Sequence, residues 1–189
     1  MEQFELACRT SQILQSFSIR HALVGSLASM SYGEPRLTRD IDFVVEMTDG
    51  QVEPFCDNFR APEYYVSTQA AREAVRNHSQ FNIIHITSGN KVDLMLTKPN
   101  DWSRQQLGRV RTVTIGPDVA VPTASPEDII VAKVWYFQGG GSQKHVHDIA
   151  GMFRHSAAEI DRAYIDHWTA ELGLTKEWRM IQDAIQDES

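Results

Sequence analysis

The chain has 189 residues, of which 42% are hydrophobic and 23% are charged, and its formal net charge is −7. The ordinary apolar fraction excludes a disordered protein, and a chain of this length can bury a core without disulfides or structural metals. The acidic balance disfavours extended nucleic-acid binding, because a broad phosphate-binding surface usually carries a basic excess.

The first two-thirds of the sequence alternate between helical and strand patterns. Apolar residues at helical spacing predict four helices, at 4–17, 26–32, 51–60 and 68–77. Apolar or alternating runs predict six strands, at 21–25, 41–46, 81–86, 92–96, 110–115 and 119–121. Turns are expected at Thr48-Asp-Gly50, Ser88-Gly-Asn90 and Gly116-Pro117, and the second of these makes a hairpin. This order predicts an α/β (α+β) fold with a mixed sheet.

The last third of the sequence contains helical patterns alone. Ser125 followed by Pro126 and two acidic residues predicts a helix start with Ser125 as the N-cap. That helix should run to Phe137, and three more are expected at 144–153, 160–172 and 175–185. We therefore predict an α/β domain over 1–122 and a C-terminal helical bundle over 123–189.

Two aspartates, Asp40 and Asp42, alternate with apolar residues at the start of the predicted strand 41–46. The period of two places both carboxylates on one face, roughly 6–7 Å apart, with Ile41 and Phe43 on the other. Such a pair repels unless a cation lies between the two groups, and Mg²⁺ commonly takes one or two carboxylates together with substrate phosphates. Taken alone, the pair also fits a strand-start turn followed by a solvated strand face.

Residues upstream of this pair suit an anionic ligand. Gly25 would let a phosphate approach the backbone, and Ser26 adds a hydroxyl at the start of a predicted helix. Arg36 and Arg39 precede the aspartates, and guanidinium groups match the oxygens of a triphosphate. Ion pairs with Glu34 or with the aspartates themselves are the alternative for both arginines.

A third acid, Asp93, lies between Val92 and Leu94 on a predicted strand, so its side chain points away from theirs. If that strand is adjacent to the strand of Asp40 and Asp42, the three carboxylates can surround two metal ions, the arrangement used for in-line attack at phosphorus. The alternative is an edge-strand aspartate paired with Lys91.

These motifs, in this order, resemble the nucleotidyltransferase superfamily with the DNA polymerase β-type fold: Gly-Ser, then Asp-x-Asp, then a distant third acid. Lys91-x-Asp93 and Asp128-x-x-x-x-Lys133 look like motifs of the AbiEii-type and minimal nucleotidyltransferase-like proteins. The segment from Lys144 to Asp148 resembles their Arg-Asp-x-x-Asp motif imperfectly, with His145 in place of an acid.

The resemblance implies a nucleotidyltransferase-type mixed sheet flanked by helices and followed by a helical part. It also implies transfer of a nucleoside monophosphate from an NTP to an acceptor, with release of pyrophosphate. The catalytic residues and the ligands of one or two Mg²⁺ ions would be Asp40, Asp42 and Asp93. The nucleotide-binding residues would be Gly25, Ser26, Arg36, Arg39, Lys133 and Lys144.

Lys133 lies among apolar residues on the helix that starts at Ser125, where an unpaired ammonium would be costly to bury. It could extend to a phosphate, or it could form a salt bridge with Asp128 or Asp148. We interpret Asp128 as a helix-cap acid rather than as a metal ligand.

Other functions stay open at this point. One is a catalytically silent nucleotide-binding module of the same fold, and another is a His-Asp metal phosphohydrolase that uses His145, His147 and Asp148. The acceptor of an active enzyme would be a small molecule, a protein side chain or a tRNA, and the acidic balance disfavours tRNA. The toxin resemblance adds a role in a toxin–antitoxin system and an antitoxin partner.

The sequence indicates neither a membrane nor an oxidising compartment. Cys8 and Cys56 form no disulfide framework and no Cys-x-x-Cys zinc pattern. The longest apolar run, 129–137, is interrupted by Lys133 and is too short to span a bilayer. Glu2 stands where a secretory signal needs positive charge. We expect a cytoplasmic protein without a membrane partner.

Overall fold

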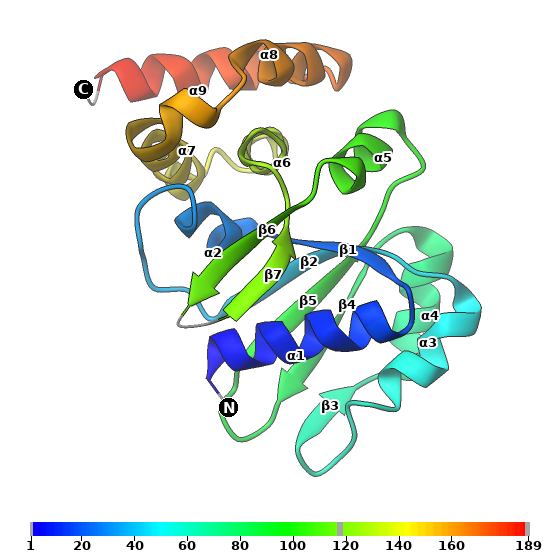
Figure 1. Ribbon diagram of the computed structural model, residues 1–189. Coiled ribbons are helices and arrows are strands. Elements are labelled where there is room, and N and C mark those ends of the chain that lie inside the picture. The colour runs from blue at the N-terminus through cyan, green and yellow to red at the C-terminus, as the bar shows by residue number, and fades with distance from the viewer. Residues whose placement is uncertain (1, 117–118, 188–189) are drawn as a thin grey trace. The chain divides into compact units, whose positions relative to one another are not determined.

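The computed structural model describes residues 2–116 and 119–187, and these form two compact units (Figure 1). The first unit takes the chain up to Leu27 together with Leu37–Ala124. The second takes Ala28–Arg36 together with the chain from Ser125 onward. A short segment from the first part of the sequence therefore belongs to the same unit as the C-terminal helices.

The first unit is built on a seven-stranded mixed sheet with the strand order β3-β4-β5-β2-β1-β7-β6. Its strands are β1 (Arg20–Val24), β2 (Asp40–Glu46), β3 (Tyr64–Val66), β4 (Gln80–His85), β5 (Lys91–Leu96), β6 (Arg111–Gly116) and β7 (Val119–Thr123). The pairs β2–β5 and β1–β7 are parallel, and the other four pairs are antiparallel. The predicted mixed sheet is confirmed.

Helices cover the apolar face of this sheet. They are α1 (Gln3–Ser16), α3 (Asp49–Cys56) and α4 (Thr68–Asn77). Helix α5 (Asp101–Gly108) contacts β1, and α2 (Gly25–Met30) begins in the first unit and ends in the second. Figure 1 shows α1 lying along β1 and β7, and α4 packs against β4. One row of register partners lies beneath them and is buried across four strands: Phe81, Leu94, Phe43 and Leu23.

A hydrogen-bonded histidine joins α1 to the sheet. His21 on β1 is buried and packs edge-on against Phe43 at 5.7 Å between ring centroids. Its Nδ1 donates to the carbonyl oxygen of Ile19 at 2.9 Å, so Nε2 accepts a hydrogen bond from Ser11 Oγ at 2.8 Å. Burial lowers the pKa of His21 despite its backbone hydrogen bond, which keeps the ring neutral.

The second unit is helical. It contains α6 (Pro126–Gln138), α7 (Gln143–Ser156), a 3₁₀ turn (Ala157–Glu159), α8 (Arg162–Glu171) and α9 (Thr175–Asp187), with α6 packed against the other three α-helices. The predicted start of α6 is confirmed, because the Ser125 side chain accepts a hydrogen bond from the Asp128 backbone amide. Asp128 is fully buried and also accepts from the Tyr164 hydroxyl at 2.8 Å, which ties α6 to α8.

Two elements escape the sequence patterns, and one predicted turn is wrong. Strand β3 has only three residues, too few to show alternation. Helix α5 buries Ser103 and Gln106 beside Leu107, so it has no apolar stripe. The predicted turn at 48–50 is instead the N-cap and first turn of α3, closed by a capping box between Thr48 and Gln51. Pro117 of another predicted turn lies outside the described residues.

In the part of the chain that the structure describes, no helix is long and apolar enough to cross a membrane.

The pH dependence of stability tests whether His21 is neutral in the folded protein. Its pKa is lowered on folding, so the unfolded chain binds a proton first, and stability is lost as the pH falls below the ordinary histidine value. Between about pH 6.5 and pH 5, the unfolding free energy of the wild type should fall more steeply than that of His21→Gln, by at most about 1.4 kcal/mol per pH unit. Urea denaturation across this range measures both slopes. Identical slopes would show that His21 carries no linked proton.

Candidate active site

The carboxylates lie on the sheet face opposite the buried apolar row. The next row of register partners across the same four strands is Asn82, Asp93, Asp42 and Val24. Asp42 on β2 and Asp93 on β5 are direct partners in a parallel pair, so their side chains share a face. Asp40 lies two residues before Asp42 and shares this face, which we call the carboxylate face: Asp40, Asp42 and Asp93.

A lysine lies among these acids. Lys91 is the register partner of Asp40, and its Nζ lies 2.8 Å from Asp93 Oδ2 and 3.4 Å from Asp40 Oδ1. The hydrogen bond with Asp93 raises the pKa of Lys91, which holds it charged. The sequence left open whether Asp93 faces the aspartate pair or pairs with Lys91, and the structure shows both arrangements together.

Gly25 is required by the site itself. It has φ +67°, a left-handed conformation that side chains rarely adopt. A Cβ built on Gly25 would lie 1.9 Å from Oδ2 of Asp42. The turn from β1 into α2 therefore passes directly against this carboxylate, and only glycine leaves room for it. The expected role of Gly25, close approach of a ligand phosphate, stays a prediction.

The donor chemistry of the carboxylate face suits a hard divalent cation such as Mg²⁺, which prefers oxygen ligands. Across residues 2–116 and 119–187, however, no group of three or more His, Cys, Asp or Glu side chains is arranged around a common metal position. Asp40 is 56% exposed, whereas Asp93 is 13% exposed. The three carboxylates thus have the ligand chemistry that a divalent metal needs, and they lie on one face. In this structure the ammonium of Lys91 supplies the positive charge among them.

Asn82 is a site residue that the sequence analysis missed. It is the β4 partner of Asp93 and is exposed on the carboxylate face, so it adds an amide beside the third acid. The β4–β5 pairing is centred between Thr87 and Ser88 rather than on the predicted turn at 88–90, so counting outward from that turn would have aligned Asn82 with Leu96 instead of Asp93.

The helical unit contains a separate ion cluster around Asp148. Lys133 Nζ lies 2.6 Å from Asp148 Oδ2, and both side chains are only 5% exposed. Arg36 donates from Nε to Oδ1 at 2.8 Å and from Nη2 to Oδ2 at 3.2 Å. Burial alone would raise the pKa of Asp148, but the hydrogen bond from Arg36 and the charge of Lys133 hold it below its ordinary value. The salt-bridge alternative for Lys133 is therefore present, with Asp148 as partner.

The partner expected for Arg36 in its ion-pair alternative is different in the structure. Glu34 instead meets Arg154, whose Nη2 lies 2.8 Å from Glu34 Oε1. His147 and His155 also approach Glu34, at 3.6 Å and 3.7 Å. The remaining predicted nucleotide contacts, Arg39 and Lys144, are exposed.

His145, which replaces an acid of the resembled motif, is a neutral ring in this structure. Burial, together with the nearby charge of Lys133, lowers its pKa to about 4. The imidazole stacks on Tyr136 with 6.4 Å between centroids, and its Nδ1 has no hydrogen-bond partner. The described histidines and Asp148 therefore do not form the ligand set of a His-Asp metal site.

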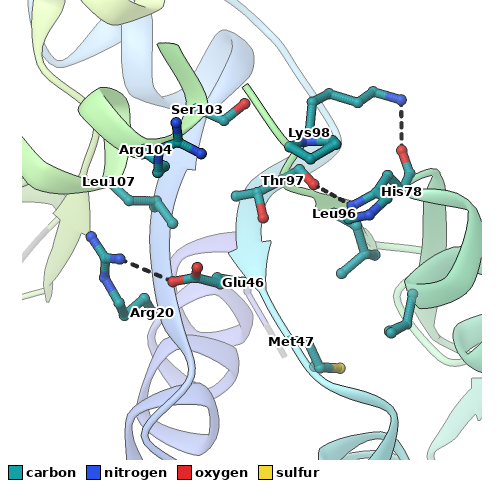
Figure 2. Close-up of a pocket in the computed structure, with 12 residues that line it drawn as sticks. Arg20, Glu46, Met47, His78, Leu96, Thr97, Lys98, Ser103, Arg104 and Leu107 are labelled. Carbon is teal, nitrogen blue, oxygen red and sulfur yellow. Dashed lines mark hydrogen bonds and ion pairs between the residues drawn. The ribbon is translucent and has the colours of Figure 1, made fainter. Parts of the chain in front are cut away.

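A cavity of about 250 Å³ lies at the other end of the strands that carry the acids. Figure 2 shows Glu46, in an ion pair with Arg20, and Leu96 in its wall, which are the last residues of β2 and β5. Across the cavity, Lys98 donates to the backbone carbonyl of His78. Because the acids lie toward the starts of β2 and β5, this cavity is not part of the carboxylate face.

Comparison with known proteins agrees with this geometry. The model of the family described as nucleotidyl transferase AbiEii toxin, Type IV TA system, matches residues 14–177. No curated protein matched the chain. The structure is similar to the antibiotic-resistance factor ANT(2'')-Ia in solution, with 14% identity and a TM-score of 0.58 over 98% of this chain and 96% of that chain.

Two further solved structures show the same likeness. One is an antigenic nucleotidyltransferase-like protein from Paracoccidioides brasiliensis, with 19% identity and a TM-score of 0.58 over 98% of this chain and 92% of that chain. The other is ANT(2'')-Ia in complex with adenylyl-2''-tobramycin, with 14% identity and a TM-score of 0.51 over 98% of each chain. At these identities the likeness shows the fold alone.

The predicted nucleotidyltransferase fold and the resemblance to AbiEii-type proteins are thereby confirmed. Since the family match spans most of the sequence, the chain belongs to the AbiEii nucleotidyl transferase family.

Proposed function

We propose that the protein is a Mg²⁺-dependent nucleotidyltransferase that moves a nucleoside monophosphate from an NTP to an acceptor. The observation that carries the proposal is the register of Asp42 with Asp93 on adjacent parallel strands, with Asp40 on the same face. In this reaction an acceptor oxygen bonds to the α-phosphorus, the bond from that phosphorus toward the β-phosphate breaks, and pyrophosphate leaves. The acceptor proton passes to a base.

Asp40, Asp42 and Asp93 would hold the cation. When bound, Mg²⁺ supplies positive charge that polarises the phosphoryl group and orients it for in-line attack. The chain itself fixes Asp42 and Asp93 by strand pairing, and it places the turn at Gly25 directly against the Asp42 carboxylate. A site held on strands is more precisely placed than one held on loops.

The nucleotide contacts of Ser26, Arg36, Arg39, Lys133 and Lys144 belong to the proposal as well. For Lys133 they compete with a buried ion pair, so its role needs a test of its own. The matching family is described as a toxin of a Type IV TA system. On that ground the proposal includes a toxin role, an antitoxin partner and a cytoplasmic location. Small hydroxylated molecules, proteins and tRNA are the acceptor classes to be compared.

A catalytically silent nucleotide-binding module of the same fold is the second candidate. The observation that favours it is the ammonium of Lys91 among the carboxylates, together with the lack of a ready-made group of three ligands in the described residues. No observation favours a His-Asp phosphohydrolase, because Asp148 is engaged by Arg36 and Lys133.

Asp42→Asn tests the enzymatic proposal. The substitution keeps the side-chain shape and removes one negative charge from the metal site, so transfer should fall by about 10²-fold or more. The assay follows labelled nucleotide from an NTP and Mg²⁺ into a pool of small molecules, protein and tRNA. Asp57→Asn, at an exposed aspartate paired with Arg60, is the matched control and should retain activity. Equal labelling by wild type and Asp42→Asn would leave the silent module standing.

Gly25→Ala and Gly89→Ala form a second matched pair. Both glycines have a left-handed backbone, with φ +67° and +69°, but nothing lies within 4 Å of a Cβ at Gly89. Each substitution should therefore lower the unfolding free energy by about 1–2 kcal/mol through backbone strain. Only Gly25→Ala should also displace the Asp42 carboxylate and reduce transfer by about tenfold or more. Retained activity in Gly25→Ala would argue against the placement of Asp42 at the reacting centre.

Lys133→Met separates a structural role from a nucleotide contact. Losing the ammonium leaves Asp148 buried with Arg36 alone, so the unfolding free energy should fall by about 2–4 kcal/mol. Lys176→Met, at an exposed lysine on α9, removes the same charge and should leave stability unchanged within about 0.5 kcal/mol. Nucleotide affinity is then measured on folded protein at low temperature. Weaker binding by Lys133→Met would support the nucleotide contact, and unchanged binding would restrict Lys133 to its ion pair.

A further inference from the structure

We propose that Lys91 is the built-in counter-cation of the carboxylate face: its ammonium holds Asp93 and Asp40 in the metal-free protein and is displaced when a divalent cation binds. The inference rests on the proposed function, which assigns these acids to metal. It gives a role to a lysine that lies inside the site yet is no metal ligand.

The strand register places Lys91 at this position. Lys91 and Asp93 are two residues apart on β5, and Asp40 is the β2 partner of Lys91, so all three side chains share a face. Nζ reaches Asp93 on its own strand at 2.8 Å and Asp40 on the neighbouring strand at 3.4 Å. The ammonium therefore bridges the two strands that the metal would bridge.

The ammonium of Lys91 offsets electrostatic repulsion among the three carboxylates. Three carboxylates on one face repel each other when no cation is present, and a fixed ammonium offsets part of that repulsion. The Lys91 side chain is 36% exposed, so it has solvent into which it can withdraw. The Lys91 ammonium can thus stabilise the carboxylate face in the metal-free protein and still move away when a metal ion binds.

Lys91 and a metal ion compete for the same oxygen atoms. Mg²⁺ binds its oxygen ligands at about 2.0–2.1 Å, and Oδ2 of Asp93 already accepts a hydrogen bond from the Lys91 ammonium, with 2.8 Å between Oδ2 and Nζ. Two cations at one carboxylate repel each other strongly at such separations. Metal binding at Asp93 therefore requires that the ammonium leave, and the affinity of the wild type for metal is lowered by the work of displacing it.

The test measures Mn²⁺ binding to the full chain by electron paramagnetic resonance. Lys91→Met removes the charge and keeps an unbranched side chain, whereas Lys91→Arg retains the charge. We expect Mn²⁺ to bind Lys91→Met about tenfold more tightly than the wild type, and Lys91→Arg to resemble the wild type. Lys98→Met, at an exposed lysine that lines the cavity at the other ends of β2 and β5, controls for net charge and should change affinity less than twofold.

Two further readouts do not depend on the affinity. In EDTA, Lys91→Met should melt at a lower temperature than the wild type, and Mn²⁺ should restore it to or above the wild-type value. In the wild type, acetylation of Lys91 followed by mass spectrometry should be slow in EDTA and at least threefold faster with Mn²⁺. The acetylation rate of Lys98 in the same molecule should stay constant.

The outcomes separate this inference from the proposed function. Tighter Mn²⁺ binding by Lys91→Met with metal-dependent exposure of Lys91 supports it. Equal Mn²⁺ affinity of wild type and Lys91→Met, or unchanged acetylation, overturns the counter-cation and leaves the metal site standing. If neither protein binds Mn²⁺, or if Asp42→Asn binds it as the wild type does, the metal assignment fails and the displacement fails with it.

Discussion

The parallel pairing of β2 with β5 is the constraint on which the rest of the first unit depends. Because side chains alternate along a strand, one register sends Phe43 and Leu94 into the core and places Asp42 beside Asp93 on the opposite face. A slip of one residue would bury the acids and expose the core. The apolar row that stabilises the fold therefore also fixes the geometry of the carboxylates, so stability and candidate chemistry share one determinant.

Placing these acids together has an electrostatic cost, which Lys91 reduces, and it leaves little space around Asp42, which Gly25 accommodates. Lys91 contributes an ammonium from the same strand as Asp93, and Gly25 lets a backbone turn pass against Asp42 where any side chain would collide. Neither Lys91 nor Gly25 adds an apolar side chain to the buried core.

The helical unit shows the same logic in its interior. Asp148 is buried, and it is held by Lys133 and by Arg36, which reaches it from the segment 28–36. Removing one member of such a cluster leaves an uncompensated charge, so motif residues here serve structure as well as any ligand. Asp128, the acid five residues before Lys133, donates its backbone amide to the N-cap Ser125 and accepts a hydrogen bond from Tyr164. Two residues of one motif thus have different roles.

The sequence by itself determined the local features: the alternation that places Asp40 and Asp42 on one face, the capped start of α6, the hairpin before Asp93 and the mixed character of the sheet. These depend on neighbours within a few residues, whose spacing is visible in the chain. The tertiary structure alone decided which strand lies beside β2, that Lys91 bridges Asp93 and Asp40, that Asn82 joins the carboxylate face, and that Arg36 meets Asp148. Strand neighbours and buried ion partners lie tens of residues apart, so they are settled by packing of the whole chain rather than by any local pattern.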